Sequence, residues 1–227
     1  MVRILGFVAT FLVPAAACAA GLVDISNRDA IKGLKEALTR GGQTAVARLG
    51  VENGFLGNDR VKIPLPPPLR KMEAVMRTIG MDGHADELVL RMNRAAEAAV
   101  PEARTLLVDA VKKMSVQDAK GILAGGEDAA TQYFKRTTSE PLAKRFQPIV
   151  KKAMEKVKLA EKYDEIAASG AKFGLVKEED AQLEDYVTRK ALDGLFVIIA
   201  EEEKKIRKDP AAAASAILRK VFGAIGK

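Results

Sequence analysis

The sequence has few of the residues on which many enzyme and metal sites depend. Among its 227 residues there are one cysteine, Cys18, one histidine, His84, and no tryptophan. A Ser-His-Asp, Cys-His or histidine-rich metal site would have to use His84, which belongs to no H-E-x-x-H pattern and follows Gly83 at a helix start. We therefore interpret His84 as a surface or capping residue, and we predict no metal and no cofactor.

Aromatic residues are also scarce, at 5% of the chain, so alanine, leucine, valine and isoleucine must fill the core. Such side chains suit the packing of helix against helix. A chain of this length buries a sizeable core without disulfides or metals. We predict an all-α fold in which residues 21–227 form a single-domain multi-helix bundle.

The N-terminus, residues 1–20, has the features of a secretory signal peptide. Arg3 supplies a positive charge, an apolar run from Ile4 to Val13 follows, and small residues up to Ala20 provide a cleavage site. The apolar run is too short for a comfortable membrane span, and no other segment could span. We predict a periplasmic protein without a transmembrane segment in the mature chain; the alternative is a lipoprotein anchored at Cys18.

The net charge at neutral pH is +7, and the basic residues are interleaved with acidic ones. Clusters such as Lys151-Lys152 are typical of solvated helix faces. Because export also argues against nucleic acid, we predict no nucleic-acid partner. Attraction to anionic lipid head groups is a weaker alternative.

Helical periodicity and capping signals divide the chain into about eight to ten helices joined by short turns. Gly41-Gly42 is a potential interruption of the first helix. Ser139, followed by Pro141, predicts the start of a new helix. Ser115 to Asp118 has the spacing of a capping box with aspartate in place of the usual glutamate.

One long stretch interrupts this helical pattern. Near 53–66 the sequence contains Asn53-Gly54, the alternating segment VKIPLP and then further prolines. Glycine and asparagine favour turns, and proline removes a backbone donor. We predict an irregular or short extended segment there.

The longest apolar helical signal after the N-terminus lies between Thr188 and Pro210. Positions three and four apart share a helix face, so one stripe contains Leu192, Leu195, Phe196, Ile199 and Ile206. At about 100° per residue, Glu202 and Glu203 return to this stripe, where an amphipathic helix normally has leucines. A buried carboxylate must be paired, hydrogen-bonded or protonated, so these two residues require an explanation.

Two interpretations of these glutamates are open. In the first, which we favour, the helix leaves the core at Ala200, and Glu201 with Lys205 and Glu203 with Arg207 form solvated pairs one turn apart. In the second, a partly buried acid lies in a cleft.

Further polar groups are predicted on inward faces of other helices. Together they define a candidate polar cleft: Asn93, Arg94, Glu97, Tyr133, Arg136, Thr137, Thr188, Lys190, Asp193, Glu202 and Glu203. One account is a buried hydrogen-bond network that specifies the packing. The other is a cleft in which carboxylates from different helices, such as Glu97 and Glu203, act as acid and base.

Several long segments resemble the bacterial domain-of-unknown-function family 4197 (DUF4197). They are VKIPLP (61–66), MNRAAEAAVPEA (92–103), DAATQYFKRTT (128–138), YVTRKALDGLF (186–196) and IAEEEKKIRKDP (199–210). The resemblance covers about residues 22–223 and implies an exported, all-helical bacterial protein. It carries over no catalytic residues, and its motifs contain much of the polar cleft.

Three hypotheses for function follow. The first is a non-enzymatic periplasmic protein that binds an envelope partner or a small amphiphilic ligand between its helices. The second is a carboxylate-dependent hydrolase or lyase. The third is a structural or scaffold protein whose amphipathic tail, 211–227, docks on a partner or on the chain itself.

Overall fold

A computed structural model describes residues 27–67, 70, 82–156 and 183–209. All regular structure in these ranges is helical, which confirms the all-α prediction. The helices are α1 (Asn27–Leu49), α3 (Asp82–Ala99), the 3-10 helix η1 (Val100–Glu102), α4 (Ala103–Lys113), α5 (Val116–Ala124), α6 (Ala129–Lys156) and α8 (Leu183–Lys208).

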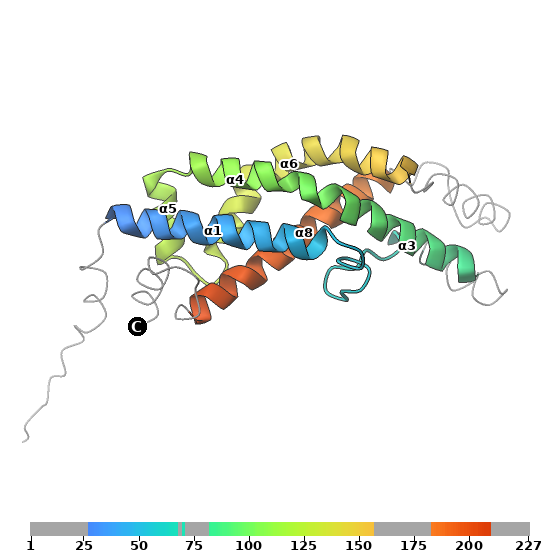
Figure 1. Ribbon diagram of the computed structural model, residues 1–227, viewed down its shortest axis with the longest axis horizontal. Helices are drawn as coiled ribbons and strands as arrows, with labels where there is room; N and C mark the ends of the chain where they lie inside the picture. Colours follow the sequence, from blue (N-terminus) through green and yellow to red (C-terminus); the bar gives the residue numbers. More distant parts are fainter. Residues whose placement is uncertain (1–26, 68–69, 71–81, 157–182, 210–227) are drawn as a thin grey trace, which may run out of the picture.

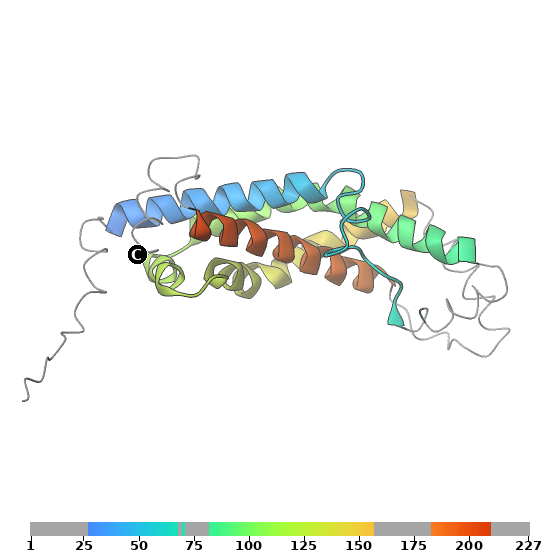
Figure 2. The ribbon, with the colours of Figure 1, turned by 90° about the horizontal axis from the view of Figure 1, so that it is seen from below.

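The helices form an elongated bundle. α3, η1 and α4 follow one another in one long row, with Pro101 in the 3-10 turn between them, and α1 lies beside α4 (Figure 1). α8 packs against both α6 and α1, and a second view shows it running between these helices (Figure 2). Contacts such as Glu203 with Thr131 and Asp185 with Gln147 show that α6 and α8 are antiparallel.

α8 is the central helix that its apolar pattern predicts. Leu192, Leu195, Phe196 and Ile199 are buried, and so is Ile198, which lies outside the stripe. Because helices cover α8 on more than one side, its middle turns can be apolar almost all round. The polar residues near its C-terminal end are thereby held close to α1, α5 and α6.

Two predicted helix breaks do not occur. α1 continues through Gly41 and Gly42, where α8 and α4 approach: a Cβ at these positions would lie 3.7 Å from Glu202 Cβ and 3.5 Å from Leu107 Cδ1. α6 likewise continues through Ser139 and Pro141, because both halves of the helix bury an apolar face. Packing therefore outweighs local helix-breaking preference at both places.

The described part of the chain thus contains six α-helices and one 3-10 helix, against the eight to ten helices predicted for the whole chain. The predicted signal peptide, Cys18, the helix after the prolines and the tail at 211–227 lie outside the described residues. The capping box at Ser115 is confirmed: its hydroxyl accepts from Asp118 N, and hydrogen bonds from Ser115 lower the pKa of Asp118.

Loop 50–66, which follows α1, is irregular as predicted and contains no strand. Asn53 has a φ of 64°, in the left-handed region that asparagine tolerates. The loop nevertheless contributes core residues, since Phe55, Ile63 and Leu65 are buried. Its Phe55 ring lies directly on the backbone of α8, where a Cβ at Gly194 would be 2.6 Å from Phe55 Cε1.

This close approach predicts that Gly194→Ala destabilises the protein. The added methyl group must displace Phe55 or Val61, and overpacking of this kind costs about 1–3 kcal/mol. Urea unfolding followed by circular dichroism measures the change. Gly121→Ala is the matched control, because Gly121 is an exposed glycine inside α5 with nothing near its Cβ position. It should stabilise the protein by about 0.5–1 kcal/mol, and a similar gain at Gly194 would contradict the predicted clash.

Candidate functional site

The eleven polar residues singled out in the sequence lie in separate groups. The first group is on α3, and it holds loop 50–66. Asn93 is fully buried, accepts from Ile63 N at 2.8 Å and donates to Ile63 O at 2.9 Å. It also donates to Val89 O at 2.7 Å. Asn93 therefore pairs with the extended backbone of the loop much as a neighbouring strand would.

Glu97 holds the same loop one helical turn further along. Its Oε1 accepts from Phe55 N at 3.0 Å and from Leu56 N at 3.1 Å. Its Oε2 lies 2.6 Å from Arg94 Nη1. Arg94 in turn donates to Asn53 Oδ1 at 3.0 Å, so backbone amides and a guanidinium together satisfy a carboxylate that is 5% exposed.

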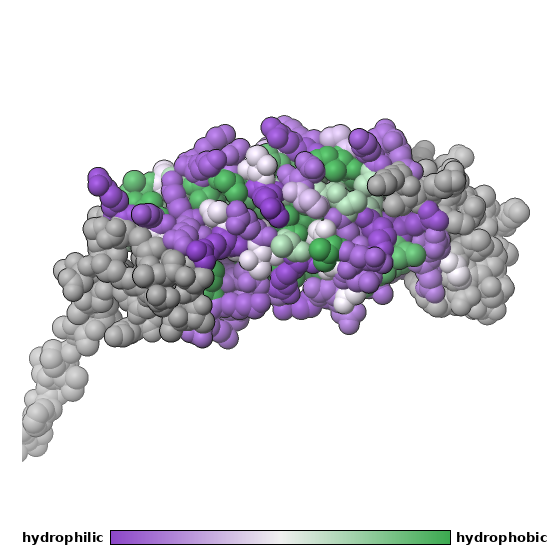
Figure 3. Space-filling model, in the orientation of Figure 1, coloured by the Kyte–Doolittle hydropathy of each residue, from purple (hydrophilic) through white to green (hydrophobic). Residues whose placement is uncertain are grey.

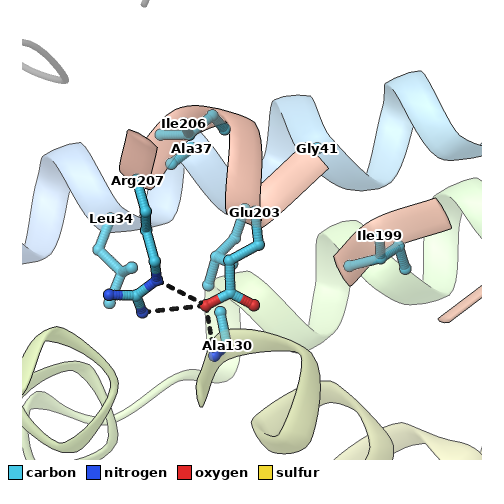
Figure 4. A pocket seen from close by; sticks show the side chains of 9 residues that line it. Leu34, Ala37, Gly41, Ala130, Ile199, Glu203, Ile206 and Arg207 are labelled. Atoms are coloured by element: carbon cyan, nitrogen blue, oxygen red, sulfur yellow. Dashed lines mark hydrogen bonds and ion pairs between the residues drawn. The ribbon is translucent and has the colours of Figure 1, made fainter. Parts of the chain in front are cut away.

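The second group is centred on Glu203, near the C-terminal end of α8. Its carboxylate accepts from Ala130 N at 3.0 Å, from Thr131 N at 2.9 Å and from the Thr131 hydroxyl at 2.8 Å. These amides belong to the first turn of α6, where backbone donors have no partner within the helix. Glu203 thus caps α6 from another helix, and its negative charge is favourable at that positive end (Figure 4).

Arg207 completes this group. Its Nε lies 3.0 Å and its Nη2 2.9 Å from Glu203 Oε1, and the two side chains are 11% and 6% exposed. Arg207 Nη2 also donates to Ile122 O, one of the last carbonyls of α5, at 3.0 Å. The pair therefore joins the C-terminal end of α5 to the N-terminal end of α6. The solvated Glu203–Arg207 pair favoured from sequence is wrong, because α5 and α6 cover this turn of α8.

The adjacent glutamates form a more exposed network. Glu202 is bound by Arg48 Nη1 at 2.8 Å and by Lys205 at 2.7 Å. Glu201 pairs with Arg48 at 3.1 Å and with Arg60 at 2.8 Å. Lys205 thus pairs with Glu202, three residues earlier, and not with Glu201 as predicted.

The other predicted site residues lie along α6 and the first half of α8. Tyr133 is buried, Arg136 lies over its ring at 5.8 Å, and burial raises the pKa of the Tyr133 phenol. Thr137 is exposed and donates to Tyr133 O, whereas the prediction placed it inward; Thr138 occupies the inward position on α6.

Thr188 is buried near the start of α8, and its hydroxyl has no hydrogen-bond partner among the described residues. Lys190 and Asp193 form a surface pair at 3.8 Å. Among the described residues, these side chains form no hydrogen bond or ion pair with Glu97 or Glu203, and those two carboxylates bind different partners.

A small apolar pocket lies beside Glu203, between α1, α6 and α8 (Figure 4). Its volume is about 20 Å³. The residues that line it are Leu34, Ala37, Leu38 and Gly41 of α1, Ala130 of α6, and Ile199, Glu203, Ile206 and Arg207 of α8. The two charged residues at its wall are the pair that binds the ends of α5 and α6.

Sequence reasoning missed several partners. Arg207 was named from sequence as the partner of Glu203, but Arg48, Thr131 and Tyr186 were not, because they carry no comparable signal. The Tyr186 hydroxyl donates to Pro64 O at 2.9 Å and so holds loop 50–66 from α8. All these partners are distant in sequence from the groups that they bind.

Across the described ranges no group of three or more His, Cys, Asp or Glu residues is arranged to hold a metal ion. None of the helices in these ranges has the length and apolarity needed to cross a bilayer.

Comparison with known proteins identifies one family. The model of a family described as a protein of unknown function, DUF4197, matches residues 24–223. No curated protein and no solved structure matches the chain.

Proposed function

The chain belongs to the DUF4197 family of proteins of unknown function, and we propose that it is a non-enzymatic, exported binding protein that holds an aliphatic group of an envelope partner between α1, α6 and α8. The observation that carries this proposal is the apolar pocket at the end of α8. The lining of this pocket, its size and the hydrogen bonds of the nearby acids all favour such a role.

The lining of the pocket favours an apolar group. Leu34, Leu38, Ile199 and Ile206 supply aliphatic walls. The charged residues offer little to a ligand, because Glu203 already accepts from two backbone amides, a hydroxyl and Arg207. A carboxylate has about four lone-pair sites. A polar head group would have to displace bonds that hold α6 in place.

The size of the pocket decides between a metabolite and a partner side chain. Pockets for drug-sized ligands measure roughly 300–1,000 Å³, whereas this pocket has about 20 Å³. A space of that size admits the end of one aliphatic side chain. A partner protein can supply such an anchor, whose full burial contributes about 1.5–3 kcal/mol.

The state of the acids supports a non-enzymatic role. Glu97 binds the amides of loop 50–66, and Glu203 binds the N-terminal end of α6. A general acid or base must exchange a proton with a substrate within hydrogen-bonding reach. Both carboxylates instead accept hydrogen bonds from groups of the protein itself. The proposal that the protein is exported rests on the sequence of residues 1–20, which resembles a signal peptide and lies outside the described residues.

A photo-crosslinking amino acid in place of Ile206, a half-buried residue at the pocket, tests the proposal in the envelope of producing cells. We expect an adduct larger than the chain by the mass of a protein. Adding Ala37→Leu, which fills the pocket from α1, should lower the adduct yield about tenfold or more. The partner's side chain could then no longer be buried there, and a loss of about 1.4 kcal/mol of binding free energy lowers the affinity tenfold.

The same crosslinker at Arg104, which is exposed on α4 and does not line the pocket, is the control. It should give no adduct of that mass. Mass spectrometry of the Ile206 adduct distinguishes the alternatives: a lipid-sized increment would favour a small amphiphilic ligand. An adduct that persists undiminished with Ala37→Leu would rule out the pocket as the binding site.

A further inference from the structure

We propose that the outer face of the second half of α6 docks reversibly on a bilayer surface that contains anionic phospholipid. The proposal rests on the distribution of charge. α6 contains seven basic and two acidic residues among its 28, so this one helix carries a surplus of five in a chain whose net charge is +7.

Four of these basic residues share one side of the helix, and we call them the cationic face: Lys144, Arg145, Lys151 and Lys152. Seven residues make nearly two turns, so the two adjacent pairs lie above one another, about 10 Å apart along the axis. All four are exposed, whereas Leu142, Phe146 and Val150 on the other side are buried. Hydrophilic side chains predominate along the upper edge of the molecule, where α6 runs (Figure 3).

The cationic face is only partly neutralised by neighbouring acids. Lys144 pairs with Glu140 at 2.6 Å, and both side chains are more than 70% exposed. Asp185 of α8 is bound by Gln147 at 2.8 Å, and Glu155 follows on α6. Within the described ranges, Arg145, Lys151 and Lys152 have no ion-pair partner. Glu140 and Glu155 lie on the same side of α6, so the four basic residues and these two acids leave the face with a net charge of +2.

The chemistry of this face fits lipid phosphates better than the alternatives. Single-stranded nucleic acid is held by aromatic side chains interleaved with basic ones, but the aromatic residue of this half of α6, Phe146, is buried. The cores of protein interfaces are rich in aromatic and apolar groups. The large hydrophobic residues that are exposed in the described ranges, Val51 and Val116, are not on α6.

Binding to an anionic bilayer requires neither exposed aromatic residues nor an apolar interface core. Such a bilayer attracts each nearby lysine or arginine with a strength that corresponds to about a fivefold gain in binding. The attraction is purely electrostatic and falls off within a Debye length, so docking is weak, reversible and sensitive to salt. This surface is distinct from the apolar pocket, and it would hold an exported protein near a membrane without a spanning helix.

Flotation of the mature chain with vesicles of equal parts phosphatidylglycerol and phosphatidylcholine tests the proposal. Wild-type protein should float with these vesicles at low salt and not with phosphatidylcholine alone. The double charge reversal Lys151→Glu/Lys152→Glu should weaken binding by at least about twentyfold, because two favourable charges are lost and two repulsive ones are added.

Lys112→Glu/Lys113→Glu is the matched control. It reverses an adjacent, exposed lysine pair on α4 and changes the net charge by the same amount. Binding should fall far less than with the α6 reversal, and circular dichroism should show that both variants are folded at the temperature of the flotation. Equal losses in the two variants would overturn the proposal, because net charge and not this face would then govern binding. Equal binding to the two kinds of vesicle would overturn it as well.

Discussion

Replacing Glu203 with alanine is expected to lower the free energy of unfolding by about 3–5 kcal/mol. The substitution leaves Arg207, whose side chain is 11% exposed, without its carboxylate. It also removes the acceptor for Ala130 N and Thr131 N at the start of α6. A mostly buried guanidinium that has lost the Glu203 carboxylate and backbone donors that have lost their acceptor act in the same direction. Urea unfolding followed by circular dichroism measures the loss.

Glu202→Ala is the matched control for this prediction. It lies on the same helix, but its partners Arg48 and Lys205 are 37% and 64% exposed, so solvent screens both ion pairs. Its loss should cost at most about 1 kcal/mol. Combining Glu203→Ala with Arg207→Leu should recover part of the stability lost by Glu203→Ala alone, because no buried cation remains. Equal costs for Glu202→Ala and Glu203→Ala would show that the Glu203 group is not a buried clamp.

Asn93→Ala should also cost about 3–5 kcal/mol. The change removes three hydrogen bonds and leaves Ile63 N and Ile63 O without partners in the interior. Each such unsatisfied buried group costs about 1–3 kcal/mol. Because Phe55 and Leu65 are core residues of the same loop, loss of the clamp should also expose apolar surface.

Hydrogen exchange locates this effect. In the wild type the Ile63 amide should exchange slowly, and in Asn93→Ala its protection should fall further than that of amides in the middle of α8. Asn58→Ala is the control, since the Asn58 side chain accepts only one hydrogen bond among the described residues, an exposed one from Arg60 N. If Asn93→Ala left the protection of the Ile63 amide against exchange unchanged, the proposal that Asn93 holds loop 50–66 would be wrong.

Both predictions concern residues that sequence analysis placed in one polar cleft. In the structure these residues bind two different parts of the backbone. Asn93 and Glu97, one turn apart on α3, face the backbone of loop 50–66, whereas Glu203 faces the first turn of α6. The acceptors that suggested acid and base chemistry are thus directed at backbone amides, and this supports the non-enzymatic proposal.

The helices themselves could be predicted to different degrees. Ser115 and Asp118 announce α5 because a capping box is local chemistry, and the structure confirms it. Ser139 and Pro141 are equally local signals, yet α6 passes through both. A proline removes one helical hydrogen bond, and the apolar contacts on either side of it, such as Phe134 and Phe146, are sufficient to hold the helix together.

The sequence by itself determined the helical class, the absence of chemistry that needs several cysteines or histidines, and the phase of α8 about its own axis. From that phase Glu203 was expected on the apolar stripe of α8, and it is buried there. Only the tertiary structure decided what Glu203 meets. Its partners Ala130 and Thr131 are more than 70 residues away, and periodicity along one helix contains no information about which helix end will pack against it. For the same reason, periodicity could not predict the pairing of Asn93 with Ile63 or the pocket between α1, α6 and α8.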